Sequence, residues 1–479
     1  MQMLRLHLII SGLAFTVCAC APNPAASQGG LLAAGEQRDL ILVSIDTLRA
    51  SRLPFYNPTL HQAPKLELAG SPDDPFSIAW LANQGVVYDS AFTTSGRTLP
   101  SLASFFTGLA PLEHGAVSNM TRLQADTYIP TLKDAGFKCH ARVANRSLHK
   151  FCGLANGFDS YAVRAKERER ELGDDLLKAA HADIVEGSRV MLWAHFMAPH
   201  QPYEPLPEYR DQLSLSSNVI AGNDQLKEAH RSPQTEQENF GAYRDLYDAE
   251  IATANQYLQD FLVNLDAKYR AANRGGLLDN AVVVFFSDHG EELADRNGYF
   301  LHAKSLYSSV VRVPLIVIDE QKGSSGHIPQ LVNLSQTMEM LLHGKDFAAE
   351  TVVSAWHNDY FSIRDVRYTL VHNPHQNAQG PLEPPEDVAY FYSAVELYDR
   401  LSDPFEMDNI ADANPQIVSR LGGQLYQWYQ SKEQVDGDAS THLDEQTLSE
   451  LGYTADPTDE HALESVGPWS LDKYSDNGR

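Results

Sequence analysis

Four apolar runs place the tightest limit on what this chain can fold into. They cover residues Asp39–Ile45, Val190–Phe196, Ala281–Ser287 and 313–319. The runs do not alternate between apolar and polar residues, so each suits a strand that is buried on both faces of a sheet. Helical patterns lie between the runs at 102–107 and 243–265, and a further one follows the last run at 330–342. Buried strands that alternate with helices predict an α/β sandwich around a large, mostly parallel sheet.

The charge balance excludes one class of partner. The 479 residues include 37 Lys and Arg but 63 Asp and Glu, so the formal net charge is −26. A surface of this charge repels polyanions, which argues against nucleic-acid binding. The apolar fraction of 43% is that of an ordinary globular protein and not of a disordered acidic tail.

The first twenty residues have the pattern of an export signal. Arg5 precedes an apolar run at 7–17, which at about 1.5 Å per residue is too short to span a bilayer of roughly 30 Å. Val17-Cys18-Ala19-Cys20 resembles a bacterial lipobox, in which Cys20 would be lipidated. A plain secretory signal, cut at a neighbouring alanine, is the alternative. We expect export to a bacterial periplasm and a lipid anchor in the outer membrane through Cys20.

Two cysteines remain outside the signal, Cys139 and Cys152. In an oxidising periplasm such a pair can form a disulfide. A metal site is the weaker alternative, because neither residue belongs to a Cys-x-x-Cys or Cys/His cluster. The pair is therefore a candidate disulfide.

Polar residues lie at the ends of three of the apolar runs, where parallel sheets bind their ligands. Asp46 follows the first run, His195 and then His200 close the second, and Asp288 and His289 follow the third. The oxygen and nitrogen atoms of Asp46, Asp288 and His289 suit Zn²⁺, Mn²⁺, Ca²⁺ or Mg²⁺. A lone Asp at such a position is otherwise an ordinary helix cap.

Two further segments carry candidate site residues. Thr98 opens a helical stretch, where its hydroxyl would meet the positive end of the helix dipole. The alternative is that Thr98 only caps the helix. His302 stands two residues before Lys304 and would contact the substrate or a second metal, unless it is a surface loop histidine.

Six segments occur in an order that resembles one family, the sulfatase family of the alkaline phosphatase superfamily. They are 42–49, 98–109 with Glu113-His-Gly115, 195–203, Ser287-Asp-His-Gly-Glu-Glu-Leu293, 302–307 with Val313-Pro314, and 396–404. The resemblance covers roughly residues 38–425. It implies an alkaline phosphatase-like α/β sandwich, with a large mostly parallel mixed sheet between helices and a small C-terminal antiparallel subdomain.

The resemblance also assigns roles to the candidate residues. It implies that Asp46, Asp288 and His289 bind a divalent metal ion, with Thr98 at the nucleophile position completing the shell. The oxygens of a small anionic ester would be held by further basic residues of the same motifs, namely His195, His200, His302 and Lys304.

Several positions depart from the family pattern. The family converts a Cys or Ser at the nucleophile position into formylglycine, and Thr98 cannot follow that route, so no formylglycine is expected. Leu102 stands where the motif has Arg, Thr47 replaces a second Asp, and Ala144-Asn-Arg-Ser147 replaces Gly-Lys-Trp-His. Three functions remain open. The first is a metal-dependent hydrolase or transferase of phosphate, phosphonate or sulfate esters with Thr98 as nucleophile. The second is an inactive lipoprotein with a binding or scaffold role, and the third is a conventional sulfatase that depends on an unrecognised modification.

We divide the chain into five parts on these grounds. They are an export signal (1–20), a flexible tether (21–37), a sulfatase-like catalytic domain (38–345), a C-terminal subdomain that completes the fold (346–453) and a polar tail (454–479).

Overall fold

The computed structural model describes most of the chain outside its two ends. The described residues are 29–56, 63–164, 166–215, 219–231, 237–296, 299–302, 305–345, 348–356, 360–373 and 393–435. Cys20 and Lys304 lie outside them, as do the export signal and the polar tail.

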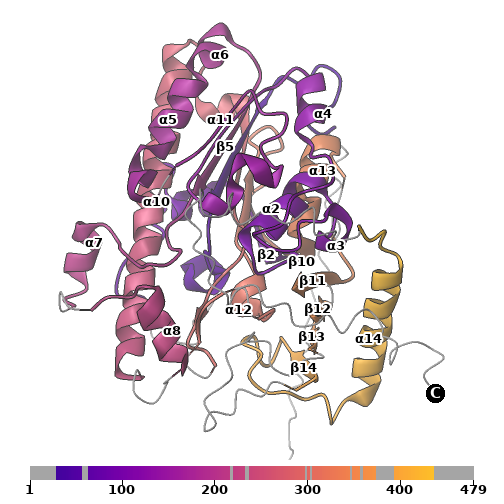
Figure 1. Cartoon of the computed structure of the whole chain (residues 1–479). Helices are drawn as coiled ribbons and strands as arrows, with labels where there is room; N and C mark the ends of the chain where they lie inside the picture. Colours follow the sequence, from indigo (N-terminus) through magenta and orange to yellow (C-terminus); the bar gives the residue numbers. More distant parts are fainter. Residues whose placement is uncertain are drawn as a thin grey trace, which may run out of the picture.

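A mixed sheet of eight strands forms the centre of the fold (Figure 1), in the order β10-β2-β9-β6-β1-β5-β3-β4. The strands are β1 (Asp39–Ile45), β2 (Val86–Phe92), β3 (Lys138–Val143), β4 (Ser160–Val163), β5 (Val190–Phe196), β6 (Ala281–Ser287), β9 (Leu315–Ile318) and β10 (Gly326–Asn333). Strand β9 runs antiparallel to both its neighbours, and the other pairs are parallel. The predicted mostly parallel mixed sheet is confirmed.

The two faces of the sheet are covered by different helices (Figure 1). Along β1, Ile41, Val43 and Ile45 belong to one apolar cluster, whereas Leu40 and Leu42 belong to another. The first cluster includes side chains of α5 (Leu172–Ala179), α6 (His181–Glu186) and α10 (Phe240–Ala271). The second includes side chains of α2 (Thr98–Thr107), α4 (Ile129–Asp134) and α13 (Thr337–His343). Strand β1 is thus buried on both faces, as its sequence predicts.

One predicted helix is wrong. Residues 330–342 do not form a continuous helix, because β10 extends to Asn333 and α13 begins only at Thr337. Leu331 and Val332 are buried in the strand and pair with β2. Their apolar side chains fit a helical period by chance, and long-range pairing with β2 decides their conformation.

A smaller antiparallel sheet follows, as predicted. Its strands pair in chain order and are β11 (Val352–Trp356), β12 (Tyr360–Arg364), β13 (Tyr368–His372) and β14 (Val395–Asp399). Helix α14 (Pro415–Gln430) covers one face through Leu421, Leu425 and Tyr429.

The described residues contain further α-helices and strands. They are α1 (Ile78–Gln84), α3 (Pro111–His114), α7 (Pro207–Gln212), α8 (Asn223–Arg231), α11 (Leu277–Asn280), α12 (Ser308–Val311), β7 (Glu292–Leu293) and β8 (Phe300–Leu301). Over the described ranges, no helix is both long and apolar enough to cross a bilayer.

The candidate disulfide is not formed. Cys139, on β3, and Cys152 are free thiols, and both are buried in the same apolar cluster. Burial raises the pKa of each thiol to about 12, so both are protonated at neutral pH. The two residues act as small apolar side chains of the core.

Candidate active site

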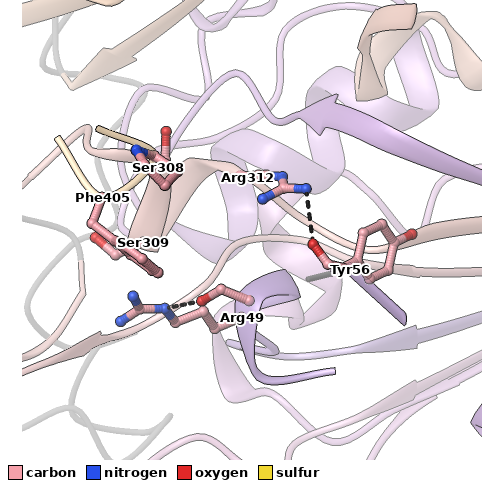
Figure 2. A pocket seen from close by; sticks show the side chains of 8 residues that line it. Arg49, Tyr56, Ser308, Ser309, Arg312 and Phe405 are labelled. Atoms are coloured by element: carbon pink, nitrogen blue, oxygen red, sulfur yellow. Dashed lines mark hydrogen bonds between the residues drawn. The ribbon is translucent and has the colours of Figure 1, made fainter. Parts of the chain in front are cut away.

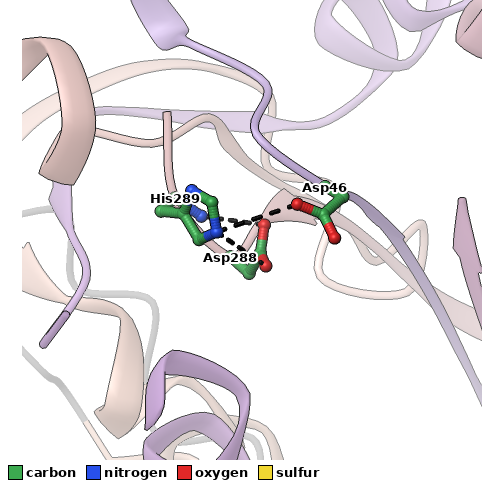
Figure 3. Close-up of side chains that lie close together, drawn as sticks. All are labelled: Asp46, Asp288 and His289. Atoms are coloured by element: carbon green, nitrogen blue, oxygen red, sulfur yellow. Dashed lines mark hydrogen bonds and ion pairs between the residues drawn. The ribbon is translucent and has the colours of Figure 1, made fainter. Parts of the chain in front are cut away.

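The predicted metal ligands meet at the carboxyl edge of the main sheet. Ile45 on β1 and Ser287 on β6 are paired in register, so the residues that follow them, Asp46 and Asp288, lie side by side. His289 extends from the same turn toward both carboxylates (Figure 3). Its Nε2 lies 3.7 Å from Asp46 Oδ1 and 3.4 Å from Asp288 Oδ2. One ligand atom from each residue falls within 4.8 Å of the others, and all three side chains are buried.

The carboxylates of this cluster are incompletely satisfied by protein groups. Asp46 Oδ1 and Asp288 Oδ2 are buried and accept no hydrogen bond. Burial raises the pKa of Asp288 well above its usual range, and the negative charge of Asp46 raises it further. Two buried carboxylates with free lone pairs are costly unless a cation lies between them. The donor set therefore fits a divalent metal ion.

Thr98 lies against the same cluster. It is the first residue of α2, and its Oγ1 is 3.4 Å from His289 Nε2. The helix is further tied to the turn after β6 by Ser101, whose hydroxyl donates to the backbone oxygen of Asp288 at 2.6 Å. Thr98 is not the N-cap of α2, since that position is Arg97. The hydroxyl therefore faces the ligands and not the helix backbone.

Asn145 is a site residue that the sequence interpretation missed. Its Nδ2 donates to Asp46 Oδ2 at 2.6 Å and to Thr98 Oγ1 at 3.2 Å. Its Oδ1 accepts from the backbone N–H of Ser147 at 2.8 Å, which fixes the orientation of the amide. The only signal was its place in the segment that departs from Gly-Lys-Trp-His. That segment lacks the Lys and the His of the family pattern, and Asn145 supplies a neutral donor to both Asp46 and Thr98.

The assignment of His195 to substrate binding is corrected. His195 lies within β5, and its side chain is fully buried. Its Nε2 is 3.3 Å from Asp46 Oδ2, and its Nδ1 is 2.8 Å from Ser44 Oγ. Both ring nitrogens are thus engaged with protein atoms, so His195 orients the Asp46 carboxylate.

Two of the predicted substrate ligands stand beside the cluster. The ring centroid of His302 is 4.4 Å from that of His289 and 5.0 Å from that of His200. His302 Nδ1 is 3.3 Å from Oε2 of Glu291, a buried carboxyl that the sequence interpretation left without a role. Burial lowers the pKa of His200 to about 3. His302 is therefore a residue of the site and not of a surface loop.

A strained turn holds Asp46 in place. Thr47 has a positive φ of 56°, a left-handed conformation that is unfavourable for a β-branched residue. Tyr247 on α10 donates to the Thr47 carbonyl at 2.7 Å and accepts from Arg49 N–H at 3.0 Å. Thr47 N–H donates to Asp288 Oδ1 at 3.2 Å. Such strain is typical of functional sites, where the surrounding contacts maintain it.

Comparison with known proteins identifies the family of the chain. The family model for sulfatases matches residues 38–344. A curated relative, the ulvan-active sulfatase of Formosa agariphila, is 25% identical over 309 residues. That match covers 55% of this chain and 55% of the relative, so the chain spans about half the length of the curated relative.

Two solved structures share the fold. A 2-O GAG sulfatase has a TM-score of 0.58 at 18% identity, over 84% of this chain and 95% of its own. The phosphonate monoester hydrolase of Agrobacterium radiobacter has a TM-score of 0.57 at 16% identity, over 86% of this chain and 97% of its own. The family match, the order of the motifs and the shared architecture lead to one conclusion: this chain belongs to the sulfatase family of the alkaline phosphatase superfamily.

Proposed function

We propose that the chain is a metal-dependent ester hydrolase with Thr98 as its nucleophile. One observation carries the proposal: Asp46 Oδ1 and Asp288 Oδ2 are buried without partners, close to His289 and to the Thr98 hydroxyl. A divalent ion held by Asp46, Asp288 and His289 would lower the pKa of a neighbouring hydroxyl and neutralise charge on the ester. Similar folds occur in a sulfatase and in a phosphonate monoester hydrolase, which supports an anionic ester as substrate.

The protein side chains have separate tasks in this reaction. Asn145 donates to Thr98 Oγ1, which fixes the direction of the hydroxyl's lone pairs. His200 and His302, with Lys304, would bind the non-bridging oxygens of the ester. Thr98 passes its proton to a water molecule as its oxygen bonds to phosphorus, and the bond from phosphorus to the leaving oxygen breaks. The leaving oxygen takes up a proton from water and departs as the alcohol. A further water molecule then adds at phosphorus and releases phosphate or phosphonate, which returns the Thr98 hydroxyl.

Phosphorus esters should be preferred over sulfate esters. In formylglycine members of the family, the second hydroxyl of the aldehyde hydrate expels the sulfate, and Thr98 has one hydroxyl only. A threonyl phosphate can be attacked by water at phosphorus. We expect the purified protein to turn over aryl phosphodiesters or phosphonate monoesters at least tenfold faster than aryl sulfates. Product release should be measured for each ester with Zn²⁺, Mn²⁺, Ca²⁺ and Mg²⁺. Faster turnover of aryl sulfate would contradict this mechanism.

An inactive scaffold role has less support. The departures at Thr47 and Leu102 motivated it, but Asp46, Asp288 and His289 still lie together as a candidate metal site. Thr98 lies against His289, and Asn145 links the Thr98 hydroxyl to Asp46, an arrangement that a reaction at Thr98 would use. Bound metal without turnover of any ester in the panel would favour the scaffold role.

Asn145 offers a test of the arrangement around Thr98. We expect Asn145→Ala to lower kcat by about 10- to 100-fold, because it removes a donor to both Asp46 and Thr98. Asn145→Asp should be worse still, since it places a third carboxylate beside two others. Asn83→Ala, at an exposed position, is the control and should keep full activity. Steady-state kinetics on the best ester, with metal content measured in parallel, checks this; an unchanged kcat would mean that Asn145 is only structural.

We further propose that the protein is anchored to a membrane through a lipid on Cys20. The short apolar run, the cysteine and the following Ala, Pro and Ser residues support this. Cys20→Ser should shift the protein from the membrane fraction to the soluble periplasmic fraction, as measured by fractionation and mass spectrometry of the N-terminus. Unchanged membrane retention with an unacylated N-terminus would refute the anchor.

A further inference from the structure

A pocket lies beside the turn that carries the metal ligands Asp288 and His289. It has a volume of about 240 Å³ and is lined by eight residues, none of which belongs to the candidate active site. Figure 2 shows it between Arg49, Ser308, Ser309 and Arg312, with Tyr56 and Phe405 as its aromatic walls. One water takes up roughly 30 Å³, so the space admits a small ion with some of its hydration.

The pocket contains the charged side chain of Arg312, on which the Asp89 carboxylate acts through space without an ion-pair contact. Arg312 donates through Nε and Nη2 to backbone oxygens of Asp89 and Tyr56, at 2.7 to 3.4 Å. Within the part of the chain that the structure describes, it forms no ion pair and its Nη1 has no hydrogen-bond partner. Burial lowers the pKa of the guanidinium, and the charges of Tyr56 and Asp89 offset this shift only in part. An anion beside Nη1 would supply the missing charge.

Hydroxyl donors complete the lining. Ser309 is 8% exposed, and its Oγ has no hydrogen-bond partner. Ser51 Oγ accepts from Arg49 Nε at 2.6 Å, which leaves its own hydrogen free to be donated. Arg49 is itself neutralised by Asp295 at 2.5 Å, so the net charge of the pocket comes from Arg312.

We propose that this pocket is a second oxyanion site, which binds inorganic phosphate or sulfate. A tetrahedral oxyanion matches one guanidinium and two hydroxyl donors in a space of this size, and it accepts hydrogen bonds in every direction. The site adjoins the metal-ligand loop: a Cβ built on Gly290 would lie 2.2 Å from Ser309 O and 3.4 Å from Arg49 Cα. The proposal does not depend on the hydrolytic activity.

Equilibrium dialysis with labelled inorganic phosphate, sulfate and methyl phosphate tests the site. The full chain is used as purified and again after removal of metal by a chelator. In both states, the wild type should bind one equivalent of inorganic anion more than Arg312→Gln, whose affinity at this site should fall at least about tenfold. Ser309→Ala should weaken binding roughly two- to tenfold without removing any bond within the protein. Equal binding of methyl phosphate would identify an anionic ester group, in place of the free ion, as the ligand and overturn the stated occupant.

A matched control separates the pocket from general charge effects. Arg142 is also buried and bonded to neutral oxygens, but it lies on β3, so Arg142→Gln should bind as the wild type does. If wild type, Ser309→Ala and Arg142→Gln bind equally in both states, the proposal is wrong. Should Arg312→Gln fail to fold, Ser309→Ala decides the question. Crystals soaked in selenate should show anomalous density between Ser309 and Arg312, and density at the metal cluster alone would overturn the site.

Discussion

Thr98→Ala is expected to lower kcat/KM for the best ester by at least three powers of ten. At about 1.36 kcal/mol per decade, this is a loss of roughly 4 kcal/mol of transition-state stabilisation. The reason is that the Thr98 hydroxyl is the candidate nucleophile. Its Oγ1 lies 3.4 Å from His289 Nε2 and accepts a hydrogen bond from the Asn145 amide. An alanine has no atom that can form the covalent ester, so direct attack by water would be the only route left.

The same variant separates a nucleophile from a helix cap. Thr98 is inside α2, and the N-cap residue is Arg97. Thr98→Ala should therefore change the free energy of unfolding by no more than about 1 kcal/mol, the value of one lost hydrogen bond. Thr98→Ser should keep part of the activity. Thr107→Ala, in the last turn of α2, removes a hydroxyl that bonds only to nearby backbone and should keep full activity. A wild-type rate for Thr98→Ala would exclude Thr98 as nucleophile.

The sequence predicted the centre of the fold because its strands are buried on both faces. The runs at Asp39–Ile45, Val190–Phe196 and Ala281–Ser287 became β1, β5 and β6 with the same bounds. Polar residues after such strands share the carboxyl edge of the sheet, so Asp46 and Asp288 were expected to be neighbours. No tertiary information was needed for that step.

The parts that were missed depend on long-range contacts. Strand β3 reads Lys-Cys-His-Ala-Arg-Val, with charged residues that hide its strand character. Its pairing beside β5 is what brings Asn145 to Asp46, and no local pattern encodes that distance. His195 was misassigned for a related reason. Its position at a strand end suggested substrate contact, but the register with Ser44 directs its ring to protein atoms.

Asp288→Asn is expected to abolish metal binding. The variant keeps the shape of the side chain but replaces an anionic ligand that has a free buried oxygen. Metal content measured by mass spectrometry should fall from about one ion per chain to near zero, and kcat/KM should fall by at least about a thousandfold. Asp183→Asn is the control, because Asp183 lies on α6 and pairs with His140 at 2.8 Å. The metal content and kcat/KM of Asp183→Asn should equal those of the wild type.

Thermal unfolding gives the prediction a second readout that does not depend on activity. The wild type should gain about 2.7 kcal/mol from metal at a free concentration of 100 Kd, whereas Asp288→Asn should gain nothing. Without metal, the wild type should no longer be the more stable of the two proteins. Asp46 and Asp288 are buried together, and burial and the charge of Asp46 raise the pKa of Asp288, so their proximity destabilises the metal-free wild type. The metal-free variant should therefore unfold at the same or a higher temperature. Equal stabilisation of both proteins by added metal would place the ion elsewhere and refute the assignment of Asp288.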